Sequence, residues 1–486
     1  MPHAGFDLAA SAREEMLHEG FQPDFAPGTE EQLAALRNRP APTPGGDVRD
    51  LRSFLWSSID NDTSRDLDQI EWAERTADGI RVLVGIADVD SDVARKTPID
   101  LHAADQTTTV YTEVRTFPML PEELSTSLTS LNENADRLAA VVEMTVAKDG
   151  SITSPAIYRA VVSNKAQLTY DGVGGWLEGN APAPAKVAAS TDLQAQLRLQ
   201  DEAAQQLREK RHELGALDFD RIEAQAVIRD GAVTDIRAHN RNRATQLIED
   251  FMVAANEAMA KTLAGAGATA IRRVVKSPER WPRIVELAAQ HGTKLPAEAD
   301  SKALAAFLTK QQQADPVHYP DLSLSVIKLM GPGEYVVARP GEEPPGHFGL
   351  AAHDYTHSTA PNRRFADLVT QRLIKALLAK QPPPYTDPEL DAIARNCTEK
   401  EDAARKVERA MQKRVAAVAL QNRVGQSFDA VVTGVTPKGV FVRIFKPPVE
   451  GRLMRGEHGL DVGDRLRVTL LSTDPERGFI DFGRAS

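Results

Sequence analysis

Four aspartates stand within nine residues of this 486-residue chain, and this crowding constrains the structure more than any other feature; they are Asp60, Asp62, Asp66 and Asp68. Asp66 and Asp68 are two residues apart, so in an extended chain their side chains point to the same side. Carboxylates this close repel one another unless a cation lies between them. A solvated acidic loop is the alternative. Against it, the segment directly precedes a strand-like pattern, with few polar residues between the two.

The oxygen-only character of this cluster favours Mg²⁺, which takes a few carboxylates and fills its octahedron with water and substrate phosphate. A calcium loop of the EF-hand type is a competing interpretation. Counted from Asp60, Glu71 fits the closing position, but Arg65 replaces the central glycine and Leu67 stands at the eighth position. Without flanking helices, the EF-hand is the poorer fit.

Composition places the chain among soluble, folded proteins, with 42% hydrophobic and 26% charged residues and length for two to four domains. The single cysteine, Cys397, excludes an intramolecular disulfide framework and a cysteine zinc site, and we expect a cytoplasmic protein. We expect no membrane segment, because no apolar run approaches about 18 residues, and no signal peptide. A net charge of −11 argues against a protein that coats DNA through bulk positive charge.

Three regions follow one another along the chain. Residues 1–46 predict a helical N-terminal module, with one helix capped by Asp7 and a second capped by Thr29, either a helix-turn-helix or an arm packed on the next domain. Residues 47–424 mix strand patterns, such as 82–89, with long helical patterns at 191–214 and 389–422. The fold class we predict is α+β.

The last region, residues 425–486, changes to short apolar runs split by turn residues, which predicts a small antiparallel β-barrel of the OB type. From Ser427 onward it carries nine Lys/Arg and eight Asp/Glu, a balance of +1, whereas the rest of the chain carries −12. Phe428, Phe441 and Phe445 beside these basic residues suit stacking on single-stranded bases. For any one of them, the barrel core is the simpler interpretation.

A second informative segment spans residues 346–368, where Arg363 and Arg364 follow Pro361 and a helical pattern begins. Guanidinium groups near the start of a helix can bind a phosphate together with the backbone N–H groups of the helix N-terminus. A role as ion-pair partners is the ordinary alternative.

Together these segments resemble the ribonuclease II/R family of exoribonucleases, which have an RNB catalytic domain. The family's I-D and D-x-D-D motif matches Ile59–Asp60 and Asp66–Asp68, and its P-M-L-P-x-E-L-S motif matches residues 118–125. Its H-F-G-L and S-P-I-R-R-Y-A-D motifs match residues 347–350 and 360–367. The resemblance covers about 50–424, and the tail from Gly425 is similar to the family's S1 RNA-binding barrel.

The resemblance implies a role for each matching residue. Asp60, Asp66 and Asp68 would hold Mg²⁺, with Asp66, Asp68 and Arg363 carrying the chemistry. RNA contacts are expected from aromatic, acidic and basic side chains, namely Tyr111, Phe219, Tyr170, Glu249, Arg364 and Phe441.

Two departures from the family pattern stand out. The fourth acid of D-x-D-D is Gln69, a neutral metal ligand, which leaves the number of metals open. Helices stand where family members usually have cold-shock barrels, so the RNA entrance should be more open on one side.

The function predicted is a processive 3′-to-5′ exoribonuclease that uses Mg²⁺ and releases nucleoside 5′-monophosphates. We expect it to act as a monomer on single-stranded RNA and on 3′ overhangs of duplexes. The alternatives are a non-catalytic RNA-binding protein with a degenerate RNB site, motivated by Gln69, and an RNA endonuclease.

Overall fold

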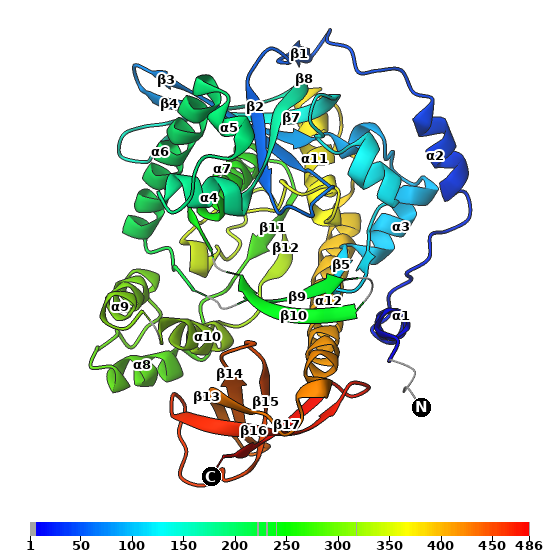
Figure 1. Cartoon of the computed structure of the whole chain (residues 1–486). Helices are drawn as coiled ribbons and strands as arrows, with labels where there is room; N and C mark the ends of the chain where they lie inside the picture. The colour runs from blue at the N-terminus through cyan, green and yellow to red at the C-terminus, as the bar shows by residue number, and fades with distance from the viewer. Residues whose placement is uncertain (1–5, 221–222, 230–231, 240, 317, 486) are drawn as a thin grey trace.

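A six-stranded sheet that curls back on itself organises the larger part of the molecule (Figure 1). The computed structural model describes residues 6–220, 223–229, 232–239, 241–316 and 318–485. The sheet has the order β1-β8-β2-β3-β4-β7, and the 18-residue β8 also pairs with β7. Its strands are β1 (Val48–Asp50), β2 (Trp56–Asp60), β3 (Gln69–Thr76), β4 (Gly79–Ala87), β7 (Asp136–Val146) and β8 (Ile152–Thr169).

The apolar run at 82–89 explains the centre of this sheet, because β4 lies between β3 and β7 and is buried along its last six residues. β7 and β8 form an antiparallel hairpin, and Gly150 in its turn has a φ of +76°, which an L-residue rarely adopts. Smaller strand pairs complete this part. They are β5 (Val110–Tyr111) with β6 (Thr116–Phe117), β9 (Glu223–Arg229) with β10 (Ala232–His239), and β11 (Ala270–Val274) with β12 (Glu334–Ala338).

Helices α6 and α7 cover the sheet, with α6 against β3, β4 and β7, and α7 against β2, β7 and β8. Their apolar residues recur every three or four positions; Leu247, Phe251, Ala255 and Met259 of α7 are all buried. The helices of this part are α3 (Pro98–Gln106), α4 (Tyr170–Leu177), α5 (Ala185–Ala188), α6 (Thr191–Leu214), α7 (Arg243–Gly265), α8 (Trp281–Gln290), α9 (Ser301–Ala314), α10 (Tyr319–Met330) and α11 (Phe365–Leu378). Short turns are η1 (Val89–Ser91), η2 (Leu124–Leu128), η3 (Phe348–Leu350) and η4 (Gln421–Arg423).

The 34-residue helix α12 (Asp387–Leu420) runs from the sheet domain down to the C-terminal barrel (Figure 1). It begins two residues before the charged pattern suggested, because Thr386 and Glu389 form a capping box and Pro388 occupies the first turn. None of the helices among the described residues is both long and apolar enough to cross a membrane.

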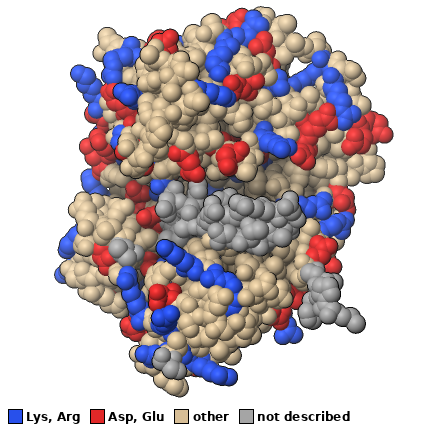
Figure 2. All heavy atoms as spheres, viewed as in Figure 1, with Lys and Arg blue, Asp and Glu red and all other residues tan. Residues whose placement is uncertain are grey.

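The predicted α+β fold with a closed C-terminal barrel is confirmed, and the barrel has the strand order β13-β14-β15-β17-β16. Phe428 is a core residue that meets Phe482 edge to face at 6.5 Å, whereas Phe445 is 41% exposed. On the face shown in Figure 2, lysine and arginine side chains lie over this barrel. Its strands are β13 (Ser427–Thr436), β14 (Gly439–Ile444), β15 (Glu450–Arg455), β16 (Arg465–Asp474) and β17 (Phe479–Arg484).

The N-terminal helices α1 (Leu8–His18) and α2 (Thr29–Arg37) lie apart and pack against different parts of the molecule (Figure 1). α1 is capped by Asp7 as expected and packs on α12. α2 packs on α3 and η2. The expected cap at Thr29 is wrong, because Gly28, with a φ of +90°, is the N-cap and Thr29 is the first helical residue.

Buried residues spaced four apart dock α1 on α12. One of them, Met16, is 1% exposed and packs in the same apolar cluster as Val407, Met411 and Val415 of α12. Met16→Ala should weaken this docking by about 2–5 kcal/mol, because it removes buried methylenes and leaves a cavity. Hydrogen exchange of the α1 amides measures the loss. The neighbouring Leu17 is 44% exposed, so Leu17→Ala is the matched control and should leave protection unchanged. Equal effects of the two variants would contradict the docked arm.

Candidate active site

The acidic segment joins β2 to β3 and is fixed by backbone contacts on both sides. Leu67 donates its N–H to Ser130 Oγ at 2.9 Å, and its carbonyl accepts the Leu131 N–H at 2.9 Å. The Asp68 carbonyl accepts the Ala87 N–H of β4 at 2.9 Å. Because these bonds hold the backbone, the carboxylates of Asp66 and Asp68 are presented from a rigid frame.

Asp68 is buried and meets the segment around Arg363. Its Oδ1 accepts the Asn362 N–H at 3.0 Å, and its Oδ2 lies 3.5 Å from Arg363 Nε. Burial raises the pKa of Asp68 to about 7, with a smaller upward effect of Asp66, while the positive charge of Arg363 acts in the opposite direction. A cation beside Asp68 would favour its charged form in the same way as Arg363 does.

Asp66 and Asp60 differ in their surroundings. Tyr111 donates its hydroxyl to Asp66 Oδ2 at 3.3 Å, and burial raises the pKa of Asp66. Asp60 Oδ1 accepts the Asn61 N–H at 2.7 Å and the Ser64 hydroxyl at 2.8 Å. The charge of Asp60 also raises the pKa of Asp66, so these two carboxylates are electrostatic neighbours.

Arg363 is held by its backbone while its side chain stays half exposed. Its carbonyl accepts the Thr109 N–H at 2.9 Å, which ties it to the strand that carries Tyr111. Asn362, one residue earlier, accepts the Thr129 hydroxyl through Oδ1 at 2.6 Å. The structure therefore brings Asp66, Asp68, Arg363 and Tyr111 together from distant parts of the chain.

The donor set fits a divalent cation by its chemistry. Asp60, Asp66, Asp68 and Gln69 offer only oxygen, which suits Mg²⁺, and Mg²⁺ usually keeps several waters and takes one or two carboxylates from the protein. The ligand oxygens of the three aspartates do not all lie within 4.8 Å of one another. Among the described residues, only Glu15, His18 and Glu19 meet that distance, and both glutamates pair with α12, Glu15 with Arg414 and Glu19 with Lys406.

Tyr170, the first residue of α4, lies beside this centre. Its carbonyl accepts Asn242 Nδ2 at 3.0 Å. Burial raises the pKa of its hydroxyl, and the negative charges of Asp60 and Glu71 raise it further. Glu71 is itself fully buried on β3, and burial together with the charge of Asp60 holds its pKa well above the usual range.

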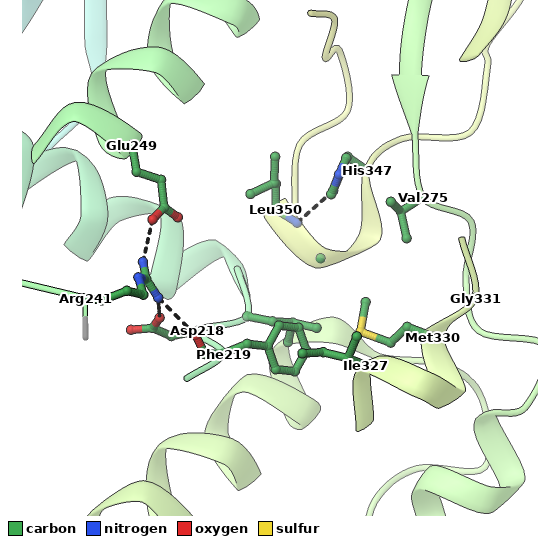
Figure 3. Close-up of a pocket in the computed structure, with 12 residues that line it drawn as sticks. Asp218, Phe219, Arg241, Glu249, Val275, Ile327, Met330, Gly331, His347 and Leu350 are labelled. Atoms are coloured by element: carbon green, nitrogen blue, oxygen red, sulfur yellow. Dashed lines mark hydrogen bonds and ion pairs between the residues drawn. The ribbon is translucent and has the colours of Figure 1, made fainter. Parts of the chain in front are cut away.

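Phe219 and Glu249 line a separate cavity of about 400 Å³, and Tyr111 is not among its lining residues (Figure 3). Arg241 lies between them, donating to the Phe219 carbonyl at 3.0 Å and pairing with the Glu249 carboxylate. Across the cavity, burial lowers the pKa of His347 to about 4, so its ring is neutral near pH 7.

Arg364 and Phe441 contact other residues than the aspartates of the acidic segment. Arg364 forms a bidentate pair with Asp367, at 2.9 Å from Nε to Oδ2 and 2.8 Å from Nη2 to Oδ1. Its guanidinium is thus engaged by the protein. Phe441 is half-buried on β14 of the barrel, opposite Arg452 in the β14–β15 register. Their contacts with RNA stay predictions.

Sequence reasoning missed three residues that this geometry singles out. The motifs did not single out Asn362, yet its backbone N–H donates to Asp68 and its side chain accepts the Thr129 hydroxyl. Glu71 entered only as a calcium-loop position, and Arg241 carried no motif at all. The i, i+2 spacing of Gln69 and Glu71 was the one signal that pointed to Glu71.

Comparison with known proteins gives two family matches. The RNB domain profile matches residues 48–380, and the profile of the RNase II-type exonuclease C-terminal S1 domain matches residues 426–485. Ribonuclease R 1 of Lactococcus lactis is 30% identical over 470 residues, covering 89% of this chain and 56% of that protein. The chain thus spans a little over half the length of that relative.

Solved structures share the fold. Mycoplasma genitalium RNase R in complex with ribose methylated single-stranded RNA has a TM-score of 0.88 at 23% identity, covering 99% of this chain and 78% of that one. Its complex with double-stranded RNA has a TM-score of 0.87. Yeast Ssd1, described as a pseudonuclease, has a TM-score of 0.71 at 17% identity, covering 92% of this chain and 56% of that one.

The RNB match covers well over half of the chain and includes both the acidic segment and the arginine segment that meets it. The S1 match covers the closed barrel. The chain therefore belongs to the RNB-domain family and carries a C-terminal S1 domain of the RNase II type.

Proposed function

We propose that this protein is a 3′-to-5′ exoribonuclease that depends on a divalent cation, with Mg²⁺ as the cation and nucleoside 5′-monophosphates as the products. The observation that carries the proposal is the junction of Asp68 with Asn362 and Arg363, beside the pair of Asp66 and Tyr111. Carboxylates that can hold a cation, an arginine and an exposed aromatic ring are what hydrolysis at an RNA end needs.

Each residue has a defined task in this reaction. When bound, the cation polarises the phosphodiester and lowers the pKa of an attacking water. Asp60, Asp66, Asp68 and Gln69 would hold it. Arg363, half exposed and held through its carbonyl, is placed to neutralise charge that develops on the phosphate. Tyr111 is 42% exposed, which leaves its ring face free to stack on a base.

Single-stranded RNA is the proposed substrate, with duplexes that carry a 3′ overhang as a second class. The RNA complexes of the Mycoplasma relative, one single-stranded and one double-stranded, support both. The N-terminal helices also bear on the second class, because α1 packs on α12 and α2 packs on α3. We propose that this arrangement leaves the RNA entrance more open on one side than cold-shock barrels would. We further propose that the enzyme acts in the cytoplasm, on the ground of its single, buried cysteine, and that it acts as a monomer.

A non-catalytic RNA-binding protein is the second candidate. Gln69 favours it, because the centre has one formal charge fewer than the family motif carries. The likeness to Ssd1 shows that a protein described as a pseudonuclease has this fold. An endonuclease is the third candidate.

One digestion separates the three candidates. A single-stranded RNA labelled at its 5′ end is incubated with the protein and Mg²⁺, and with EDTA in parallel. An exonuclease acting from the 3′ end gives a descending ladder and free mononucleotides, and an endonuclease gives scattered internal fragments. A binding protein leaves the RNA intact while retarding it in a gel.

Asp68→Asn should abolish hydrolysis while RNA binding is retained, because the amide oxygen still accepts the Asn362 N–H but the ligand charge is gone. Release of labelled mononucleotide and a binding titration measure the two properties. Asp62→Asn is the matched control, since Asp62 is an exposed carboxylate of the same segment. Wild-type rates for Asp68→Asn would contradict the assignment.

Arg363→Ala should lower the single-turnover rate by roughly 10²–10³, as is typical for the loss of one preorganised donor. Arg363→Lys should recover part of the rate, because it keeps the charge but not the planar fork. Arg75→Ala is the control: this arginine is exposed on β3 and pairs with Glu202. If Arg363→Ala and Arg75→Ala behave alike, Arg363 does not act on the phosphate.

Tyr111→Ala should keep hydrolysis but lengthen the final product, because stacking contributes roughly 1–3 kcal/mol per base and a short RNA would dissociate earlier. Tyr111→Phe keeps the ring and removes only the hydroxyl that binds Asp66, so it should give the wild-type product. Sizing of the limit products on a sequencing gel measures the difference. Identical products from all three proteins would remove Tyr111 from the RNA site.

A further inference from the structure

Glu71 is a fully buried carboxylate for which the fold provides no partner. The side chain is 0% exposed, and neither carboxylate oxygen has a hydrogen-bond partner among the described residues. A buried, uncompensated charge is strongly destabilising, so such a group needs either a proton or a cation.

The residues that the strand register and the hydrogen bonds place beside Glu71 are polar and uncharged. Ser57 stands opposite Glu71 in the β2–β3 register, so both side chains share one face of the sheet. Gln200 of α6 donates its Nε2 to the Glu71 carbonyl at 3.5 Å. Ser57 Oγ and Gln200 Oε1 are also buried without a hydrogen-bond partner in the described part of the chain. Glu71, Ser57 and Gln200 thus all carry buried side-chain oxygen atoms that have no hydrogen-bond partner in the described part of the chain.

This group adjoins the metal centre. Gln69 and Glu71 alternate along β3, so their side chains point to the same side of the strand. Asp60 is the last residue of β2, the strand that pairs with β3 at Ser57 and Glu71. Glu71 therefore lies on the strand pair that carries Asp60 and Gln69, where Gln69 leaves the family motif one charge short.

We propose that Glu71 supplies the carboxylate that Gln69 lacks and serves as a further anchor for the divalent cation held at Asp60. The proposal rests on the metal centre of the proposed function. It restores the charge of the family's four-acid motif by moving the fourth carboxylate two residues along the same face of β3. Oxygen ligands in this number suit Mg²⁺ and Mn²⁺.

The test is calorimetric titration of the full-length protein with Mn²⁺ in the absence of RNA, so that binding is measured apart from activity. Glu71→Gln keeps the size of the side chain and should weaken Mn²⁺ binding by about tenfold or more, in the range found when groups that support a metal site are removed. Glu74→Gln, on the same strand but 44% exposed, should bind as the wild type does.

A rescue variant separates a ligand from a structural residue. Adding Gln69→Asp to Glu71→Gln returns the charge to the motif position and should restore Mn²⁺ affinity to within about threefold of the wild type. Unchanged affinity in Glu71→Gln would overturn the proposal and identify Glu71 as a protonated core residue, while leaving the proposed function intact. Absence of any Mn²⁺ binding by the wild type would overturn both.

A folding defect is recognised by a second measurement. If Glu71→Gln lowers the thermal midpoint, the shift that Mn²⁺ adds to this midpoint is compared between variant and wild type, because a ligand raises it in proportion to its affinity for the folded state. A full wild-type shift in the variant would also overturn the proposal.

Discussion

The contact between Asp68 and the Asn362–Arg363 segment is the interaction on which the site depends. It joins residues 294 positions apart, and it places a backbone donor and a guanidinium against one buried carboxylate. The same segment is bound to the Tyr111 strand through the Arg363 carbonyl and to Thr129 through Asn362. Because the carboxylate is buried, a shift of this segment would leave it unpaired in the interior, and the geometry is therefore held by the cost of breaking it.

Helix α12 has the corresponding role for the molecule as a whole. Its first half packs in the core of the sheet domain through Leu390 and Cys397, and its middle packs against α1 through Val407 and Met411. Its last turns enter the barrel core, where Leu420 is fully buried. One continuous helix thus fixes the S1 barrel and the N-terminal helix relative to the catalytic sheet.

Charge at the centre is distributed differently from the family motif. Gln69 removes one formal charge from the motif, whereas Glu71 places a buried carboxyl group two residues later on β3. Counting charges within the motif alone suggests a weakened site. With the proposed cation bound at Asp60, Glu71 would be ionised and would return that charge to the centre.

The sequence by itself determined the elements with strong periodicity: the buried strand β4, the β7–β8 hairpin, helices α6, α7 and α12, and the C-terminal barrel. Apolar spacing and turn residues are local properties, so they are legible without the fold. Helices α8–α10 were not predicted, and the cap of α2 was placed one residue late. The motifs also identified Asp68 and Arg363, because cation binding requires carboxylates and neutralising a phosphate requires a positive side chain.

Only the tertiary structure decided which of these residues meet. The contact of Asp68 with Asn362, the hydrogen bond of Tyr111 to Asp66 and the burial of Glu71 without a partner all arise between segments far apart in the chain. It also engaged Arg364 with Asp367 and placed Arg241 between Phe219 and Glu249. Residue types limit which contacts are chemically possible, but packing of the sheet, the helices and the loops decides which side chains lose their water and which find a partner.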